Sequence, residues 1–510
     1  MDVKPASIVI LVVGLALAAA IGLMLGPGAS WWLEHVDGVT GLQGEKLAAA
    51  VDAVRGRALA VATGLAALLA VYYTARNADT ARRTFQLGER GHDTDRYGKA
   101  AEQLGHDKAP VRLAGLYALE ELAQNNPALR QRIVDVICAY LRMPFSPPQD
   151  DDQENAHPAV PRAAIGGRSD NTDKLEERDR REERQVRLAA QRVLAAHLRY
   201  ELAHKHWHLL GRRWSRRAKR PSGSFWPSIR IDLTEATLFD FDFDESRMRS
   251  ADFAGATFTG KAQFRGATFS GEADFSGATF DQVAKFHRST FRRRASFDDV
   301  TFKGGAVFDR ATLSWFAGFD RITVAGDIAF SGTIFEYMAS LRGVSVTGNV
   351  SFHRATFAKE AAFDDSTFAC NFRFQGVNSN GYAGFRGTVF AGDANFAGTT
   401  LAHAEFGRAT FERQADFSGV SFIGAALFED ATFTVGASFV RASFGKKARF
   451  AAQQLAQPID LEGALLLPGA MGQEHQWPPR WRVRPDGKGG GVLHREPMEG
   501  EQGPAPQMPA

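Results

Sequence analysis

Large apolar residues recur every five or six positions through the C-terminal half of the chain. The spacing is five from Leu233 to Phe258, and it then alternates between six and five as far as Leu466. Most of the 39 phenylalanines of the sequence lie on this register, a concentration that a mixed core does not require. The best-kept part of this ladder consists of Phe253, Phe258, Phe264, Phe269, Phe275, Phe280, Phe286, Phe291, Phe297 and Phe302.

The residue two positions before each ladder residue is usually small, as Ala262 is before Phe264. A large and a small inward residue, repeated every five or six positions, fit neither the period of a strand nor that of a helix. They fit short flat sides separated by corners, stacked as coils so that Phe lies on Phe and backbone hydrogen bonds join successive coils. The pattern therefore predicts a mainly β fold, a solenoid with a filled interior.

Three stretches of this region carry a family resemblance. IDLTEATLFDFDF and ADFAGATF resemble the pentapeptide-repeat family, whose pattern is A(D/N)LXX with Leu or Phe at the centre. KAQFRGATFSGEADFSGATF is similar to the Phe-rich variant of that family, which has an eleven-residue double repeat. The resemblance covers residues 231–466 and implies a right-handed quadrilateral β-helix. Its coils would hold about 22 residues, and roughly ten or eleven of them at ~4.8 Å each would form a rod of about 50 Å.

Two apolar runs near the N-terminus predict a membrane anchor over residues 1–79. The first run covers residues 6–26 and the second 58–75, near the lower limit for a helix that crosses ~30 Å of hydrocarbon. Arginines follow the second run and Lys4 precedes the first. The positive-inside rule then predicts a multi-pass cell-membrane protein with its N-terminus and bulk C-terminal region in the cytoplasm. The alternatives are a cleaved signal peptide for the first run and a buried Ala-rich helix for the second.

Helical periodicity predicts a small α-helical region at residues 80–144 and a helical and basic segment at 181–220. An acidic, proline-rich linker is expected between them, at 145–180. The string VRLA begins at Val111 and again at Val186, as in one or two HEAT-like helical hairpins. The strings QLGERGHDTDRYGKAAEQLG and VRLAGLYALEELA, together with the two apolar runs, are similar to membrane-anchored pentapeptide-repeat proteins of unassigned function.

Two groups of residues in the second helical segment are candidate sites. His197, His204 and His208 share one helix face and are weak metal-ligand candidates, with a polar helix end as the alternative. A basic run beyond them could contact anionic lipid or, less readily, nucleic acid, or could be a solvated connection. The run consists of Arg212, Arg213, Arg216, Arg217, Lys219 and Arg220.

The ladder has two faults. Its middle position is lost between Phe374 and Phe385, and the spacing from Leu401 to Phe406 is five where six is expected. The first fault predicts a bulge, which is either a candidate interaction site or a tolerated loop. The bulge residues are Asn378, Asn380 and Tyr382. Beyond the ladder, residues 468–510 are rich in Pro, Gly and Gln and are predicted to be a disordered tail.

Composition and motifs narrow the function. Two cysteines, Cys138 and Cys370, exclude a disulfide scaffold and a Cys-based zinc finger. The net charge of +3 excludes action through bulk charge. The chain has no GxSxG, HExxH or Walker motif, so neither an enzyme nor a cofactor is expected.

We therefore expect a membrane-anchored scaffold whose cytoplasmic rod binds an unidentified protein partner. The alternative is a membrane-associated sensor or regulator that responds to an ion or ligand. The family resemblance also raises a DNA mimic that binds topoisomerase, which requires an acidic rod. Residues 230–466 carry 24 Lys and Arg against 27 Asp and Glu, so this role and nucleic-acid binding are both disfavoured.

Overall fold

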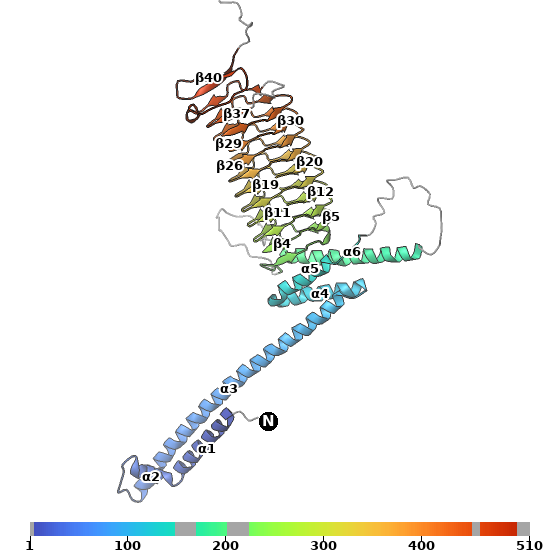
Figure 1. Cartoon of the computed structure of the whole chain (residues 1–510). Coiled ribbons are helices and arrows are strands. Elements are labelled where there is room, and N and C mark those ends of the chain that lie inside the picture. Colours follow the sequence, from blue (N-terminus) through green and yellow to red (C-terminus); the bar gives the residue numbers. More distant parts are fainter. Residues whose placement is uncertain (1–4, 148–169, 201–223, 451–458, 497–510) are drawn as a thin grey trace, which may run out of the picture. The chain divides into compact units, whose positions relative to one another are not determined.

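The computed structural model describes residues 5–147, 170–200, 224–450 and 459–496. It divides into two compact units, Met1–Asp95 and Arg96–Ala510, which are described separately. Figure 1 shows the helices of the N-terminal half and the stacked coils of the C-terminal half.

The first unit is helical. It contains α1 (Pro5–Leu25), α2 (Gly28–His35) and the first part of α3 (Glu45–Leu104). Ala29, Leu33 and Val54 form its small buried core. The described apolar segment Gly14–Leu25 ends at a break and continues into α2 through a bend of 80°.

The two membrane spans expected at 6–26 and 58–75 are supported only in part. Within the described residues, one segment, Glu45–Arg82 of α3, is long and apolar enough by length and composition to cross a membrane. A second span would be present only if α1 and α2, which are joined by the bend, crossed the membrane together as a single span. The apolar segment of α1 turns sharply at Gly26 and Pro27 instead of continuing as one straight helix, so one weak candidate span replaces the two that were expected.

The second unit begins with a bundle of helices. The end of α3 is followed by α4 (Ala109–Asn125), the short η1 (Pro127–Leu129), α5 (Arg130–Arg142) and α6 (Asp170–Leu198). Apolar residues from α3, α4, α5 and α6 are buried together, among them Leu104, Leu116, Ile137 and Val186.

Helix α6 begins earlier than the predicted helical segment. It begins at Asp170, inside the expected linker at 145–180, and ends at Leu198. Ion pairs one turn apart, Arg178–Glu182 and Arg180–Glu176, stabilise a helix in a stretch without an apolar stripe, which explains the early start. Most of the remainder of the expected 181–220 segment lies outside the described residues.

The recurring VRLA string has a structural explanation. Arg112 donates to the backbone oxygens of His106 and Asp107, just beyond α3, and Arg187 donates to those of Leu141 and Met143 at the end of α5. Each arginine therefore satisfies carbonyls at the C-terminus of the preceding helix, where no intrahelical partner is available. Both arginines also contact the carboxylate of Glu183, at 3.0 and 2.8 Å.

The C-terminal part of the second unit is a β-solenoid of about ten turns. Strands of two residues are its usual unit, and one regular coil comprises β10 (Thr290–Phe291), β11 (Ala295–Ser296), β12 (Thr301–Phe302) and β13 (Ala306–Val307). In the regular coils each strand pairs in parallel with the strand 22 residues further on, as Phe291 does with Leu313. The strands fall into two long sheets, and their inward side chains fill the interior. The hand of the coil stays a prediction.

The ladder phenylalanines fill that interior. All ten residues of its best-kept part have an exposed fraction of 0%. Phe264 and Phe286 stack with ring centroids 4.9 Å apart and planes 3° apart, and Phe286 stacks on Phe308 at 4.7 Å. Phe286 also meets the edges of Phe275 and Phe297, so stacked and edge-to-face contacts alternate through the core.

One corner in each eleven residues has a left-handed backbone. The residue two after every second ladder position has positive φ, as Gly277 (66°) does after Phe275 and Arg288 (58°) after Phe286. Glycine adopts this conformation freely, whereas other residues lose about 1–2 kcal/mol there. The coil geometry imposes the angle, because Arg or Asp also occupies this position at several corners.

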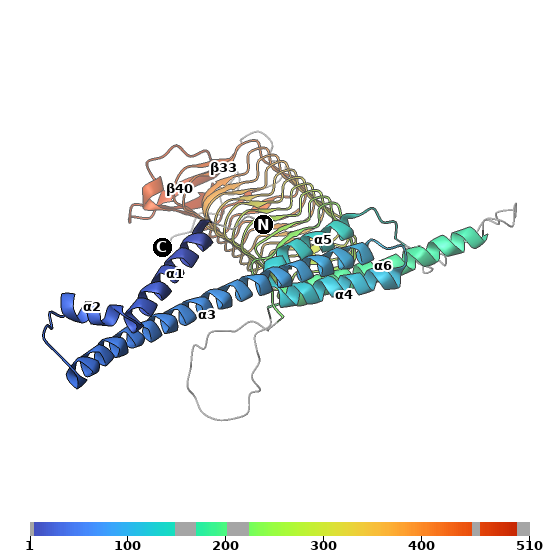
Figure 2. The same ribbon diagram turned by 90° about the horizontal axis from the view of Figure 1, so that it is seen from below.

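Both ends of the solenoid are covered. At the first coil, α5 and α6 contact β1 (Arg230–Asp232) and β2 (Thr237–Asp242), as Figures 1 and 2 show. Gln131 bonds both the N–H and the C=O of Arg230, and Gln191 does the same for Phe239. Two glutamine amides thus supply the hydrogen bonds that a preceding coil would have made.

The C-terminal end corrects the prediction of a disordered tail at 468–510. Strands β40 (Trp481–Pro485) and β41 (Gly491–Arg495) form an antiparallel hairpin, and β41 pairs antiparallel with β39 (Leu465–Leu466), the last ladder strand. Trp481 is buried and donates its indole N–H to the oxygen of Ile459. A composition rich in Pro and Gly is typical of hairpin turns as well as of disordered segments, so it could not distinguish the two. Residues 497–510 lie outside the described residues.

Candidate functional site

The most distinctive surface of the solenoid is one column of corners. These corners follow β10, β14 (Thr312–Leu313), β18 (Ile334–Phe335) and β22 (Thr356–Phe357), which pair in unbroken register. Because each coil has 22 residues here, the middle corner residues lie above one another. They are Arg293, Trp315, Tyr337 and Lys359, which we call the aromatic corner.

The two central residues of the aromatic corner are exposed and stacked. The rings of Trp315 and Tyr337 lie 4.8 Å apart with planes 8° apart, and their exposed fractions are 51% and 42%. Beside them, the guanidinium of Arg294 lies 5.4 Å from the ring centre of Phe316. A shallow hollow of about 390 Å³ is lined by Glu272, Arg293, Arg294, Trp315 and Phe316. Exposed aromatic rings on a solenoid whose interior is already filled are not needed for its core, so they mark a candidate contact surface.

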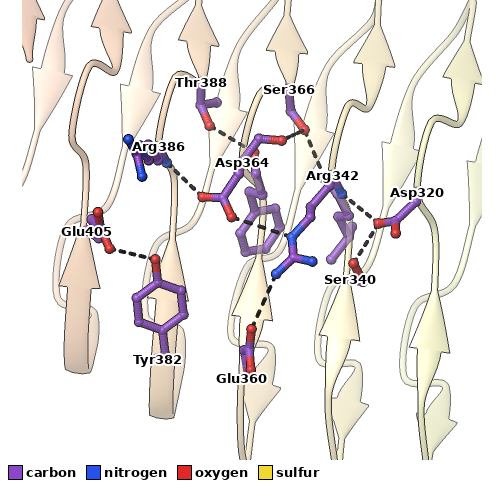
Figure 3. A network of polar contacts seen from close by, with 12 residues as sticks. Asp320, Ser340, Arg342, Glu360, Asp364, Ser366, Tyr382, Arg386, Thr388 and Glu405 are labelled. Atoms are coloured by element: carbon purple, nitrogen blue, oxygen red, sulfur yellow. Dashed lines mark hydrogen bonds and ion pairs between the residues drawn. The ribbon is translucent and has the colours of Figure 1, made fainter.

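A network of charged and polar groups lies on the neighbouring coils (Figure 3). Arg342 bridges the carboxylates of Glu360 and Asp364, each at 3.5 Å. Asp364 also accepts the backbone N–H of Arg386 from the following coil, at 2.9 Å. Asp320 accepts in the same way from Arg342 and from the hydroxyl of Ser340. The carboxylates therefore tie successive coils together.

The predicted bulge appears as a register shift. Strands β26 (Asn378–Gly384) and β29 (Thr400–Glu405) are seven and six residues long, and their pairing shifts between Ser379 and Tyr382. The two ladder faults therefore form one feature, because β29 has one residue fewer than β26 at the point where they pair. Asn378 and Asn380 lie exposed on β26.

Tyr382 is held within this irregular coil. Its hydroxyl donates to Glu405 at 2.7 Å, as Figure 3 shows, and its ring stacks on that of His403. Burial and the Glu405 carboxylate raise the pKa of the Tyr382 hydroxyl above its ordinary value. Tyr382 is therefore fixed as a hydrogen-bond donor on the coil that follows the aromatic corner.

The sequence had suggested that the middle ladder position between Phe374 and Phe385 is lost. In the structure this position is occupied. Ser379 pairs with Phe357 and Leu401 and has an exposed fraction of 0%. Phe372, a large residue at a position that is normally small, packs against Phe374, and Phe374 stacks on Phe357, the residue with which Ser379 pairs, at 6.0 Å. Phe374 leaves its regular stack, and its plane makes angles of 57° and 48° with those of Phe352 and Phe396.

The histidine prediction receives a different explanation. His197 is buried at the junction between α6 and the solenoid, where its ring stacks on Trp226 at 3.9 Å. Its two ring nitrogens lie 2.7 Å from oxygens of Ser224 and Glu120. No group of three or more His, Cys, Asp or Glu able to hold a metal occurs in the described part of the chain. His204, His208 and the basic run Arg212, Arg213, Arg216, Arg217, Lys219 and Arg220 lie outside the described residues.

Sequence reasoning missed the aromatic corner. The signal was available, because Trp315 and Tyr337 are 22 residues apart and occupy the same place after a ladder residue. Reading the outward positions at the period of a coil would have placed them together. Gln131 and Gln191 carry no comparable signal, since nothing periodic distinguishes them.

Comparison with known families supports the repeat assignment. Models described as pentapeptide repeats match residues 231–271 (eight copies) and 264–312 (nine copies). The C-terminal region therefore contains pentapeptide repeats, in agreement with the resemblance read from its motifs. Comparison with curated proteins and with solved structures gives no match.

Proposed function

We propose that the protein is a membrane-anchored scaffold whose solenoid binds a partner protein in the cytoplasm. The observation that carries this proposal is the aromatic corner, where Trp315 and Tyr337 are exposed on a solenoid whose interior is already filled. Rigid repeats hold such side chains at fixed positions, which reduces the entropy cost of binding.

The membrane anchor is supported by the exposure of apolar residues on α3. The exposed fractions lie between 56% and 68% for Leu59, Val61, Leu68 and Val71. None of the residues in the most apolar stretch of the Glu45–Arg82 segment is buried. Apolar residues exposed around a helix suit a lipid environment better than water. Arg76 and Arg82, which follow this stretch, favour a cytoplasmic solenoid.

Photocrosslinking tests the scaffold in native membranes. A photoreactive phenylalanine analogue at Tyr337 should yield discrete crosslinked species of one or a few partner proteins. The matched control places the analogue at Val435, an exposed corner residue of the other sheet. Equal, diffuse crosslinking at both positions would contradict the proposal.

The two cysteines of the chain provide a topology test. Cys370 is exposed on the solenoid, whereas Cys138 is buried and burial raises the pKa of its thiol to about 12. A membrane-impermeant maleimide should therefore label one thiol, and only after the cells are opened. Labelling of Cys370 in intact cells would place the solenoid outside, and recovery of the protein in the soluble fraction would refute the anchor.

A further inference from the structure

The aromatic corner alternates in chemistry along the stack of coils. Read coil by coil, its residues are Arg293, Trp315, Tyr337 and Lys359, that is, a cation, two aromatic rings and a second cation. Within the described parts of the chain, neither Arg293 nor Lys359 has an ion-pair partner. The charges at both ends of the aromatic pair are thus available to a ligand.

The spacing of these residues is set by the coils. With about 4.8 Å between coils, the three steps from Arg293 to Lys359 measure about 14 Å. An extended peptide rises about 3.3 Å per residue, so two of its side chains four residues apart are separated by about 13 Å. Acidic side chains at positions i and i+4 would therefore meet Arg293 and Lys359, while the residue between them lies over Trp315 and Tyr337.

Neighbouring carboxylates argue against a flat anionic ligand. Glu272 lines the hollow beside Arg293, and Glu336 is exposed next to Tyr337. An anionic bilayer or a nucleic-acid backbone would bring further negative charge against both groups. A narrow peptide can place its few acids at the two cations and leave these carboxylates in water.

We propose that the aromatic corner binds an extended acidic segment of the partner protein, with two Asp or Glu residues four positions apart on either side of an aromatic residue. This proposal rests on the scaffold function and names the chemistry of its partner. Its affinity comes from aromatic packing on Trp315 and Tyr337, and its selectivity from the spacing of the two cations.

Fluorescence polarisation with the full chain in detergent or nanodiscs tests the spacing. The probes are labelled peptides Ser-Glu-Ala-Phe-Ala-Glu-Ser, with glutamates four apart, and variants with glutamates two or six apart or replaced by glutamine. We expect the first peptide to bind at least tenfold more tightly than each of the others. Equal affinity across the series, or no binding at millimolar peptide, would overturn the proposal.

Charge reversal supplies the specific control. The double variant Arg293→Glu with Lys359→Glu should bind the acidic peptide at least tenfold more weakly. It should instead bind a peptide that has lysines at the same two positions. Arg413→Glu, which changes the equivalent corner position of the other sheet, should leave binding unchanged. Tighter binding of oligothymidine or of phosphatidylserine vesicles than of the acidic peptide would assign the surface to another ligand class.

The two proposals fail in different ways. If the peptide series and the charge reversal give no effect while crosslinking at Tyr337 persists in native membranes, the scaffold stands and its partner has other chemistry. If crosslinking is also absent, the scaffold function itself is contradicted.

Discussion

The interior coils and the two terminal coils of the solenoid solve the same problem by different means. An interior strand such as β10 finds its hydrogen-bond partners in the coils before and after it, and the repeating sequence supplies both. At the N-terminal end, Gln131 and Gln191 replace the missing coil, and at the C-terminal end the hairpin of β40 and β41 covers the last strand. A repeat therefore specifies its interior completely, whereas its ends need residues that do not repeat.

The ends matter because an uncovered strand edge is a template for further pairing. Identical coils without covers would present unpaired N–H and C=O groups and could join end to end. The glutamine amides satisfy such groups with side chains, and the antiparallel hairpin ends the parallel stacking. Four of the following predictions test this division between interior and ends, and a fifth tests the solenoid surface, beginning with the largest effect.

The interior should tolerate no charge. Phe286→Asp places a carboxylate at a position with no exposure, between Phe264 and Phe308, and no partner can neutralise it there. We expect loss of the solenoid, seen as loss of the cooperative thermal transition in circular dichroism. Phe286→Leu should keep the transition, and so should Arg293→Ala, an exposed control; an unchanged Phe286→Asp protein would refute the assigned register.

The irregular coil allows a test of interior packing. Phe372→Ala should destabilise by about 3–5 kcal/mol, because it leaves a cavity among Phe374, Phe385 and Phe396. Ser379→Phe alone should also destabilise, by about 1–3 kcal/mol, through overpacking. The double variant restores the regular small and large pattern. Its loss of unfolding free energy, measured by denaturant unfolding, should therefore be smaller than the sum of the losses of the two single variants. Additive losses would show that the two sites do not share one volume.

Removal of the C-terminal cover should change the association state. A chain ending after Leu467 exposes the edge of β39, which now pairs with β41. We expect concentration-dependent oligomers in light scattering with size-exclusion chromatography. A chain ending after Glu496 is the control, because it keeps the hairpin. Identical elution of both truncated proteins would show that the hairpin does not protect the edge.

The N-terminal cover should have a smaller, local effect. Gln191→Leu leaves the buried N–H and C=O of Phe239 without partners, at a cost of about 1–3 kcal/mol. Gln131→Leu acts at an exposed site and should cost less. Hydrogen exchange should report faster exchange of the Phe239 amide in the first variant, and equal protection in both proteins would contradict this role.

The smallest effect is expected at the solenoid surface. The guanidinium of Arg321 donates two hydrogen bonds to Asp299, one coil below it, and lowers the pKa of that carboxyl below its ordinary value. A lowered pKa in the folded state contributes stability above the unfolded pKa, and this contribution is lost as the pH falls through the folded value. Asp299→Asn should therefore lower the melting temperature slightly at pH 7, by about 1–2 °C, and the difference should shrink as the pH falls below the ordinary pKa of an aspartate. Both side chains are more than half exposed, so salt should reduce the difference, and a large effect would contradict a screened surface pair.

The sequence was sufficient for the regular coils of the solenoid because their inward positions obey one period. It was insufficient at the irregular coil, where a large Phe372 accompanies a small Ser379, since these residues belong to different sheets. The covers could not be predicted because Gln131 meets Arg230 from 99 positions away. The start of α6 was misplaced because ion pairs, and not an apolar stripe, stabilise the helix over residues 176–182.

The amide clamps of Gln131 and Gln191 also have a consequence for the order of synthesis. Helices α4, α5 and α6 leave the ribosome before any coil does, so the surface that receives β1 and β2 already exists when these strands emerge. Each completed coil then offers the next a ready edge, and folding can advance at the pace of translation, from one end only. The hairpin of β40 and β41 follows the last coil in the sequence, so it can cover the stack only after every coil has been made.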